Sequence, residues 1–117
     1  IWLNSTIGLL QMLMLRKETR GAYIRIDASI IRDLLLPNPR MMSEKDFRKF
    51  EALYDRLRVR KFPSILQQLK HRDANRKALD RVCLEYMGIG NQEIDELAAY
   101  LYPSLANEIE VLKRLMR

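Results

Sequence analysis

The second half of the chain carries apolar side chains at helical spacing. Asp73 can cap the start of one helix, because its side chain can accept a hydrogen bond from a free N–H in the first turn. Gly88 follows the last apolar position and suits the left-handed conformation that often ends a helix. The apolar positions of this helix fall on one face and are Ala78, Leu79, Val82, Cys83, Tyr86 and Met87.

Two further helices are expected after this glycine. Asn91 can cap the first, and Pro103 is expected to end it, because proline lacks the N–H that continues a helix. Ser104 then starts the last helix. The inward face of the first consists of Ile94, Leu97, Ala98 and Leu101. The apolar stripe of the second consists of Leu105, Ile109, Leu112, Leu115 and Met116.

The middle of the chain predicts one longer and one short helix. Ser43 and Asp46 are spaced as in a capping box, with Asp in place of the usual Glu or Gln. The apolar face that follows them consists of Phe47, Phe50, Leu53, Tyr54 and Leu57. Pro63 then breaks the chain, and Ser64 can cap a short helix that continues through Leu69.

The first helix is expected to begin at a cap among residues 4–6 and to run to about Lys17. Its segment Ile7–Leu15 is apolar on nearly every side, and a helix without a polar stripe is buried on most sides. The run is too short to span a bilayer, and Gln11 interrupts it, so no membrane role is expected. We expect this helix to be buried against the rest of the chain, on a domain or subunit outside it, or in a homo-oligomer.

Between these helices lies a segment with strand character. Residues 19–21 predict a turn, and residues 22–27 are β-branched and aromatic with partial alternation, which predicts one short strand. A short helix is expected over Ile30–Leu36, capped by Asp27 or Ser29 and ended by the Pro37–Pro39 step. The fold class is therefore mainly α, with five to seven short helices and at most a small β element near residues 22–27.

The net positive charge lies in the first half of the chain. Residues 1–61 hold 13 Lys or Arg and 7 Asp or Glu, whereas residues 62–117 hold 8 of each, so the net charge of +6 lies in the first part. This division predicts a basic N-terminal part and a neutral C-terminal part within one compact domain. The chain starts at Ile1 inside an apolar run, and we expect it to be a fragment of a longer protein.

The basic residues of the first half group at the ends of predicted elements. Cations near helix C-termini are favoured by the helix dipole, which explains each group without any ligand. The functional alternative is contact with the phosphates of DNA. The candidate DNA-binding residues are Arg16, Lys17, Arg20, Arg25, Arg56, Arg58, Arg60 and Lys61.

Chemically reactive residues are few. His71 is the only histidine, and Cys83 is the only cysteine and lies on a core stripe. The glycines form no phosphate-binding loop, and the His, Cys and carboxylate residues do not have the spacing of a zinc site. We therefore expect no catalytic, cofactor-binding or metal-binding residue in this chain. A lone thiol and the absence of a signal-like segment favour a reducing compartment, the cytoplasm.

Three segments resemble adenine-specific DNA methyltransferases of restriction–modification systems. Residues 2–10 read Trp-Leu-Asn-Ser-Thr-Ile-Gly-Leu-Leu and are similar to the Leu-Asn-Ser segment that leads into an apolar helix in that family. Residues 21–39 are similar to its glycine-led strand and short helix that end in a Pro-x-Pro step. Residues 76–89 resemble the helical tail of such enzymes.

The resemblance implies the region that follows the catalytic domain. The family's Asn/Asp-Pro-Pro-Tyr/Phe loop and its glycine-rich S-adenosylmethionine motif are both absent from this sequence. It thus implies a non-catalytic module that contacts DNA and packs on its own catalytic domain, while S-adenosylmethionine serves the parent enzyme. The alternative is a helical protein–protein interaction module or subunit with no nucleic-acid role.

Overall fold

The computed structural model describes residues 1–18, 24–25 and 28–115. Six α-helices lie within these residues, which confirms the mainly α fold class. They are α1 (Thr6–Leu15), α2 (Ala28–Asp33), α3 (Glu44–Leu57), α4 (Ile65–Lys70), α5 (Ala74–Tyr86) and α6 (Asn91–Leu115). A 3-10 turn, η1 (Trp2–Asn4), precedes α1, and two short strands, β1 (Lys17–Glu18) and β2 (Ile24–Arg25), follow it.

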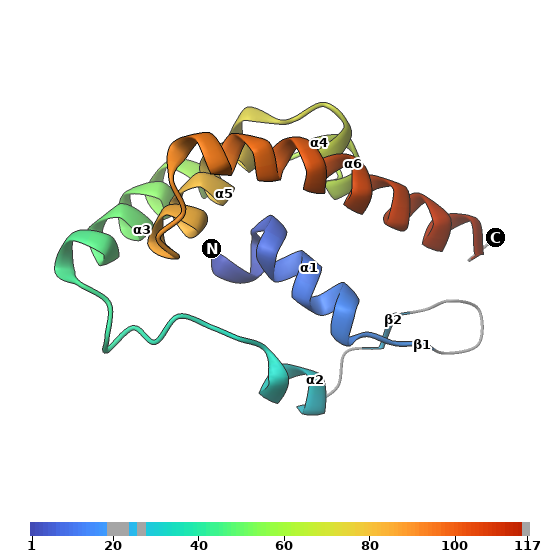
Figure 1. Ribbon diagram of the computed structural model, residues 1–117, viewed down its shortest axis with the longest axis horizontal. Helices are drawn as coiled ribbons and strands as arrows, with labels where there is room; N and C mark the ends of the chain where they lie inside the picture. The colour runs from blue at the N-terminus through green and yellow to red at the C-terminus, as the bar shows by residue number, and fades with distance from the viewer. Residues whose placement is uncertain (19–23, 26–27, 116–117) are drawn as a thin grey trace.

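The long helix α6 organises the molecule. It packs on α4 and α5, while α3 packs on α5 and α1 contacts both α5 and α6 (Figure 1). One buried cluster joins α4 to α6 through Leu69, Tyr102, Leu105 and Ala106, with Leu10 and Leu13 of α1 packed against it. A second joins α3 to α5 through Leu53, Leu57 and Leu79. Helices from the basic and the neutral part therefore share both clusters.

The predicted helix starts are confirmed where a side chain caps the first turn. Ser5, Ser43 and Ser64 each accept a hydrogen bond from the backbone N–H three residues later. Asp73 accepts from two backbone N–H groups of the first turn of α5. These caps depend on local sequence only, which is why the pattern of residues could place them.

The prediction that Pro103 ends a helix is wrong. Helix α6 continues through Pro103 to Leu115 as one element. Pro103 faces solvent, so water can reach the carbonyl of Ala99 that loses its usual N–H partner. Tyr102 and Leu105, on either side of the proline, are buried in the same cluster and hold both halves of the helix in line.

The predicted boundaries around the strand also need correction. Helix α1 ends at Leu15, two residues before the expected end, because the chain turns into β1 there. Strand β1 pairs antiparallel with β2, with Lys17 opposite Arg25. The predicted strand thus pairs with a segment that begins at the expected last residue of the first helix. The predicted turn at residues 19–21 lies outside the described residues. Helix α2 covers Ala28–Asp33 rather than Ile30–Leu36 and ends before the proline step.

Several predicted inward positions face solvent instead. Phe47 and Tyr54 of α3 are 52% and 56% exposed, because α5 covers only the side of α3 that carries Leu53 and Leu57. Met87 and Leu115 are exposed at the ends of their helices. Asn91 does not cap α6 from outside: it is the first residue of the helix, and its side-chain oxygen accepts a hydrogen bond from Arg81. A helical period identifies faces, but only the tertiary contacts decide how wide a buried face is.

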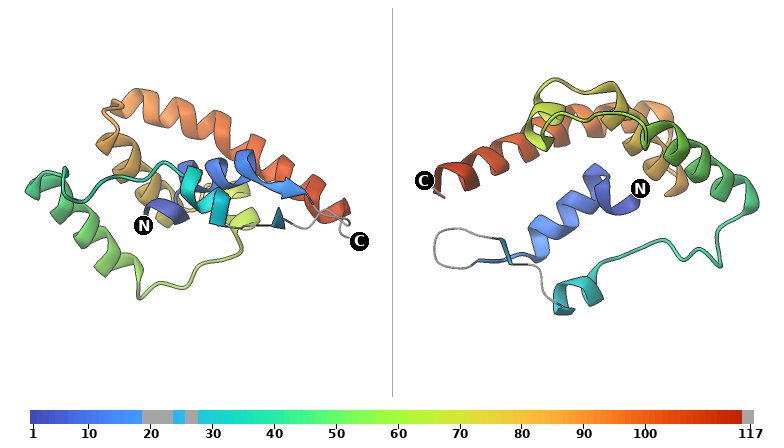
Figure 2. Two further views of the ribbon diagram at one scale, coloured as in Figure 1. Left: turned by 90° about the horizontal axis from the view of Figure 1, so that it is seen from below. Right: turned by 180° about the vertical axis from the view of Figure 1, so that it is seen from behind.

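Helix α1 is less enclosed than its sequence predicts. Among its residues only Thr6 and Gly8 are fully buried, and Met14 is 76% exposed. Helices α4, α5 and α6 cover one side of α1, and α2 covers part of another (Figures 1 and 2). An apolar part of α1 is therefore left at the surface.

A candidate nucleic-acid interface on helix α3

The predicted DNA-binding residues fall into two separate groups. Arg16, Lys17 and Arg25 lie at the end of α1 and in the paired strands, whereas the other described ones lie in the last turn of α3 and directly after it. Figures 1 and 2 show α3 at one end of the molecule and the strands at the other. Arg20 lies outside the described residues. The fold thus keeps the two groups apart.

Arg16 takes part in packing rather than in an open basic surface. Its guanidinium lies 2.7 Å from the carboxylate of Glu108 on α6 and donates to the carbonyl of Leu13. Its side chain is only 21% exposed. Arg16 therefore fixes the end of α1 to α6, which leaves the group after α3 as the stronger candidate site.

The second group forms an exposed basic segment at the end of α3. Arg56 lies in the last turn, and every residue from Arg58 to Ile65 is exposed. Arg58 lies 3.4 Å from Asp55, which is itself exposed. Within the described part of the chain, Arg56, Arg60 and Lys61 form no ion pair. We call the cations of this group the connection cations; they are Arg56, Arg58, Arg60 and Lys61.

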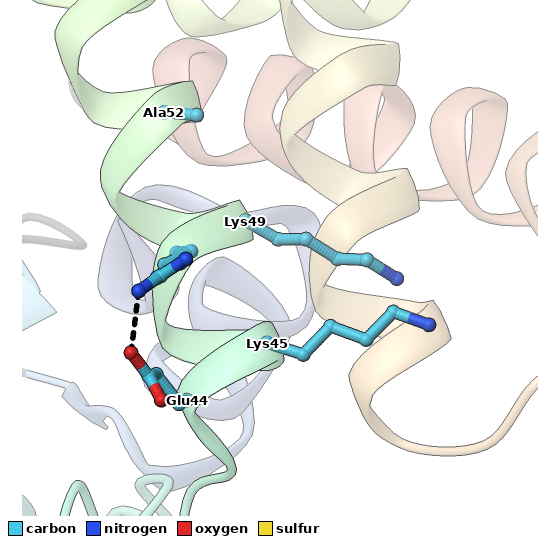
Figure 3. A pocket seen from close by; sticks show the side chains of 5 residues that line it. Glu44, Lys45, Lys49 and Ala52 are labelled. Carbon is cyan, nitrogen blue, oxygen red and sulfur yellow. Dashed lines mark hydrogen bonds and ion pairs between the residues drawn. The ribbon is translucent and has the colours of Figure 1, made fainter.

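Helix α3 carries two more cations that the sequence analysis did not select. Lys45 and Lys49 are exposed and, across the described residues, have no ion-pair partner. With Arg56 they lie within a sector of about 40°, since each residue advances a helix by about 100°. We call Lys45, Lys49 and Arg56 the α3 stripe. Figure 3 shows the two lysine side chains extending in the same direction from the helix.

The charges of α3 are sorted by face. Arg48 lies off the stripe and forms an ion pair with Glu44 at 2.5 Å. Glu51 and Asp55 lie about 100° or more around the helix from the stripe, by the same helical geometry. The stripe itself borders the buried side, where Leu53 packs against α5. The spacing of these lysines was visible in the sequence, but the face that α5 covers was not.

Two shallow hollows run along the stripe. The first has a volume of about 460 Å³ and is lined by Glu44, Lys45, Arg48, Lys49 and Ala52 (Figure 3). The second has a volume of about 350 Å³ and is lined by Lys49, Ala52, Leu53, Arg56 and Val82. The two share Lys49 and Ala52 in their linings, so they adjoin each other on α3, and we refer to them together as the depression. The small side chain of Ala52 leaves its floor open between the cations.

The molecule also contains a buried polar cluster. The Asp80 carboxylate accepts three hydrogen bonds. Two come from Thr6, from its backbone N–H at 2.6 Å and its side-chain hydroxyl at 2.5 Å, and the third comes from the Tyr102 hydroxyl at 2.5 Å. Nearby, Arg76 donates to the side chain of Gln68 and to the carbonyl of Asn4. Among the described residues, no buried side-chain polar atom lacks a partner. These groups hold η1 and α1 against α5 and α6.

The Tyr102 phenol of this cluster and the nearby Cys83 thiol are held in their neutral forms. Burial is the main cause that raises the pKa of the Tyr102 phenol above its ordinary value, and the Asp80 carboxylate adds to it. Burial likewise raises the pKa of the Cys83 thiol from 9.0 to about 11. The nucleophile of a cysteine is the thiolate, so Cys83 is a packing residue. Its thiol is fully buried.

An apolar groove lies between α1, α4 and α6. It has a volume of about 360 Å³, and its lining residues are Leu9, Met12, Leu13, Ile65, Leu69, Leu105 and Ile109. Three of them come from the segment that the sequence analysis expected to be covered by a partner. The groove is the second candidate binding surface of the molecule, after the basic surface of α3.

The described residues contain no group of three or more His, Cys, Asp or Glu side chains placed to hold a metal ion. In the same part of the chain, every helix is too short or too polar to cross a membrane. No family model, curated protein or solved structure matches the chain. The basic surface of α3 and the apolar groove are therefore the features that bear on function.

Proposed function

We propose that this chain is a non-catalytic DNA-contacting module of an adenine-specific DNA methyltransferase of a restriction–modification system. The observation that carries the DNA contact is the exposed basic segment after α3. Its four cations lie within six residues and form one ion pair among the described residues, Arg58 with Asp55 at the surface. A surface pair of this kind contributes little, so these cations remain able to contact phosphates.

The resemblance of residues 2–10, 21–39 and 76–89 to such methyltransferases supports the assignment to this family. In this proposal, the target adenine and S-adenosylmethionine bind to the parent enzyme's catalytic domain. The module holds DNA beside that domain, and the apolar part of α1 packs on it. The proposal places the protein in the cytoplasm, where the lone thiol of Cys83 stays reduced.

Binding to a fluorescently labelled DNA duplex tests the proposal. We expect a dissociation constant of roughly 10⁻⁴ to 10⁻⁶ M at physiological salt, with affinity falling steeply as salt rises, as for non-specific phosphate contacts. Replacing Arg58→Glu together with Arg60→Glu should weaken binding to all sequences alike. Loss confined to one sequence would indicate base reading instead.

The matched control is Lys113→Glu with Arg114→Glu, which changes the net charge equally at the exposed end of α6. We expect the control to bind DNA much more tightly than the variant of the connection cations. Equal loss in both variants would show only a response to net charge. Absence of binding at tens of micromolar protein in low salt would overturn the DNA role.

A protein-interaction module is the second candidate function, and one observation favours it. Helix α1 leaves Met14 exposed and lines the apolar groove with three other residues, as an interface helix would. Sedimentation equilibrium separates the two candidates. A chain that binds no DNA but forms oligomers that Met14→Gln dissociates would be an interaction module.

A further inference from the structure

The α3 stripe offers more positive charge than the proposed DNA contact uses. Lys45 and Lys49 extend in the same direction from the helix (Figure 3), and helical spacing places Arg56 on the same side. Among the described residues, no carboxylate pairs with any of the three. The helix dipole does not account for the two lysines: Lys45 lies in the first turn, where the dipole disfavours positive charge, and Lys49 lies in the middle of the helix.

The dimensions of the stripe suit a phosphate backbone. Lys45 and Arg56 are eleven residues apart, which corresponds to about 16 Å along the helix axis. One strand of duplex DNA advances about 3.4 Å per phosphate along the duplex axis, and its phosphates are farther apart along the winding backbone, so about five is the upper limit for the number of phosphates beside the stripe. The hollows between its cations share one floor at Ala52 and leave room for a backbone to lie along the helix.

The stripe meets the connection cations at Arg56, which belongs to both. Arg58, the C-cap of α3, lies on the side of the helix that carries Asp55, and the exposed Arg60 and Lys61 follow it in the chain. Glu51 and Asp55 lie on another side of α3, Asp46 accepts a hydrogen bond from the capping Ser43, and Glu44, at the end of the first hollow, pairs with Arg48. A polyanion that lies along the depression therefore meets positive charge from one end of α3 to the other.

We propose that the α3 stripe binds the phosphate backbone of one strand of duplex DNA. This strand runs from the connection cations along α3 towards Lys45. This inference rests on the proposed DNA contact and extends it to a binding path and a direction. Lys45 and Lys49 each contact phosphate, and Ala52 allows the close approach of the strand. The bases of that strand face away from α3, so its sequence is not read there.

The test compares the salt dependence of duplex binding by three proteins. Each phosphate contact adds about 0.9 to the slope of log K against log salt, so Lys45→Gln with Lys49→Gln should lower the slope by about 1.8. The control, Lys77→Gln with Lys113→Gln, removes the same charge from exposed positions on α5 and α6 and should leave the slope unchanged. Lys45→Arg with Lys49→Arg should restore the wild-type slope.

The outcomes separate this inference from the proposed function. If the Arg58→Glu, Arg60→Glu variant loses DNA but Lys45→Gln with Lys49→Gln keeps the wild-type slope, the path along α3 is wrong and the DNA contact stands. If the wild-type chain binds no duplex, both are wrong. If poly-glutamate displaced the labelled duplex as effectively as unlabelled duplex does, the assignment of the stripe to a nucleic-acid backbone would be wrong. Circular dichroism of each variant confirms that the helices are intact.

Discussion

Asp80 joins three segments that are distant in the sequence. Its carboxylate is almost fully buried, and its partners Thr6 and Tyr102 lie on α1 and α6. The acceptor also satisfies a free N–H in the first turn of α1, which otherwise has only Ser5 as a cap. A single residue of α5 thus fixes where α1 starts.

Replacing Asp80→Ala should destabilise the protein strongly. Three donors lose their acceptor in the core, and each buried unsatisfied group costs about 1–3 kcal/mol, so we expect a loss of about 3 kcal/mol or more. Urea unfolding followed by circular dichroism measures it. The control is Asp95→Ala, which breaks the exposed pair with Arg81 and should cost about 1 kcal/mol or less. Similar losses for both would contradict the role given to Asp80.

Cys83 should make stability fall at high pH. Its folded pKa of about 11 exceeds the ordinary value of 9.0, mainly because the thiol is buried. Above pH 9 the unfolded chain loses the thiol proton while the folded chain keeps it, so the stabilisation present below pH 9 is lost as the pH rises towards 11. The free energy of unfolding should therefore decline more steeply for the wild type than for Cys83→Ala. Parallel declines would show that the thiol is not the cause.

At the scale of the element, the packing of η1 against α1 depends on Gly8. A β-carbon at this position would lie 2.5 Å from the carbonyl oxygen of Trp2 and 2.7 Å from that of Leu3. Both are backbone atoms, so they cannot move aside cheaply. Glycine is required at position 8 because the backbone of η1 lies too close to leave room for a side chain.

The substitution Gly8→Ala should lower stability although alanine is the better helix former. The gain of about 1 kcal/mol expected in an open helix is outweighed by the clash with η1. Thermal unfolding provides the measurement. Gly90→Ala is the matched control, because a β-carbon there has no atom within 4 Å. A stabilised Gly8→Ala protein would show that η1 does not pack as described.

The helices were predictable to different degrees. Ser43, Ser64 and Asp73 act on backbone groups within three residues, so the sequence alone located those starts. Pro103 could not be interpreted locally, because the buried side chains on both sides of it keep α6 continuous. Strand β2 lies within the segment whose partial alternation predicted a strand, whereas β1 is only two residues long and its pairing with β2 could not be predicted from the sequence.

At the scale of the whole molecule, charge and apolar surface are separated. The structure measures 45 × 32 × 29 Å, with α3 near one end and the apolar groove between α1, α4 and α6. The sequence identified a basic first half and an unusually apolar first helix. It could not show that Arg16 is turned inward to Glu108, or that α5 leaves the side of α3 with Lys45, Lys49 and Arg56 exposed. Both depend on how the helices pack.

The proposed assembly gives each surface one partner. DNA lies along α3 and the connection cations, and the apolar side of α1 packs on the rest of the parent enzyme. The two surfaces are built from different helices, so a variant of one should leave the other intact. This separation is what makes the matched variants described above informative.

The most direct test is the reactivity of individual lysines towards an acetylating reagent, measured by mass spectrometry with and without duplex DNA. The account predicts that DNA protects Lys45, Lys49 and Lys61, while Lys77 and Lys113, exposed on α5 and α6, react as before. Protection of Lys77 and Lys113 with Lys45 and Lys49 still reactive would contradict it.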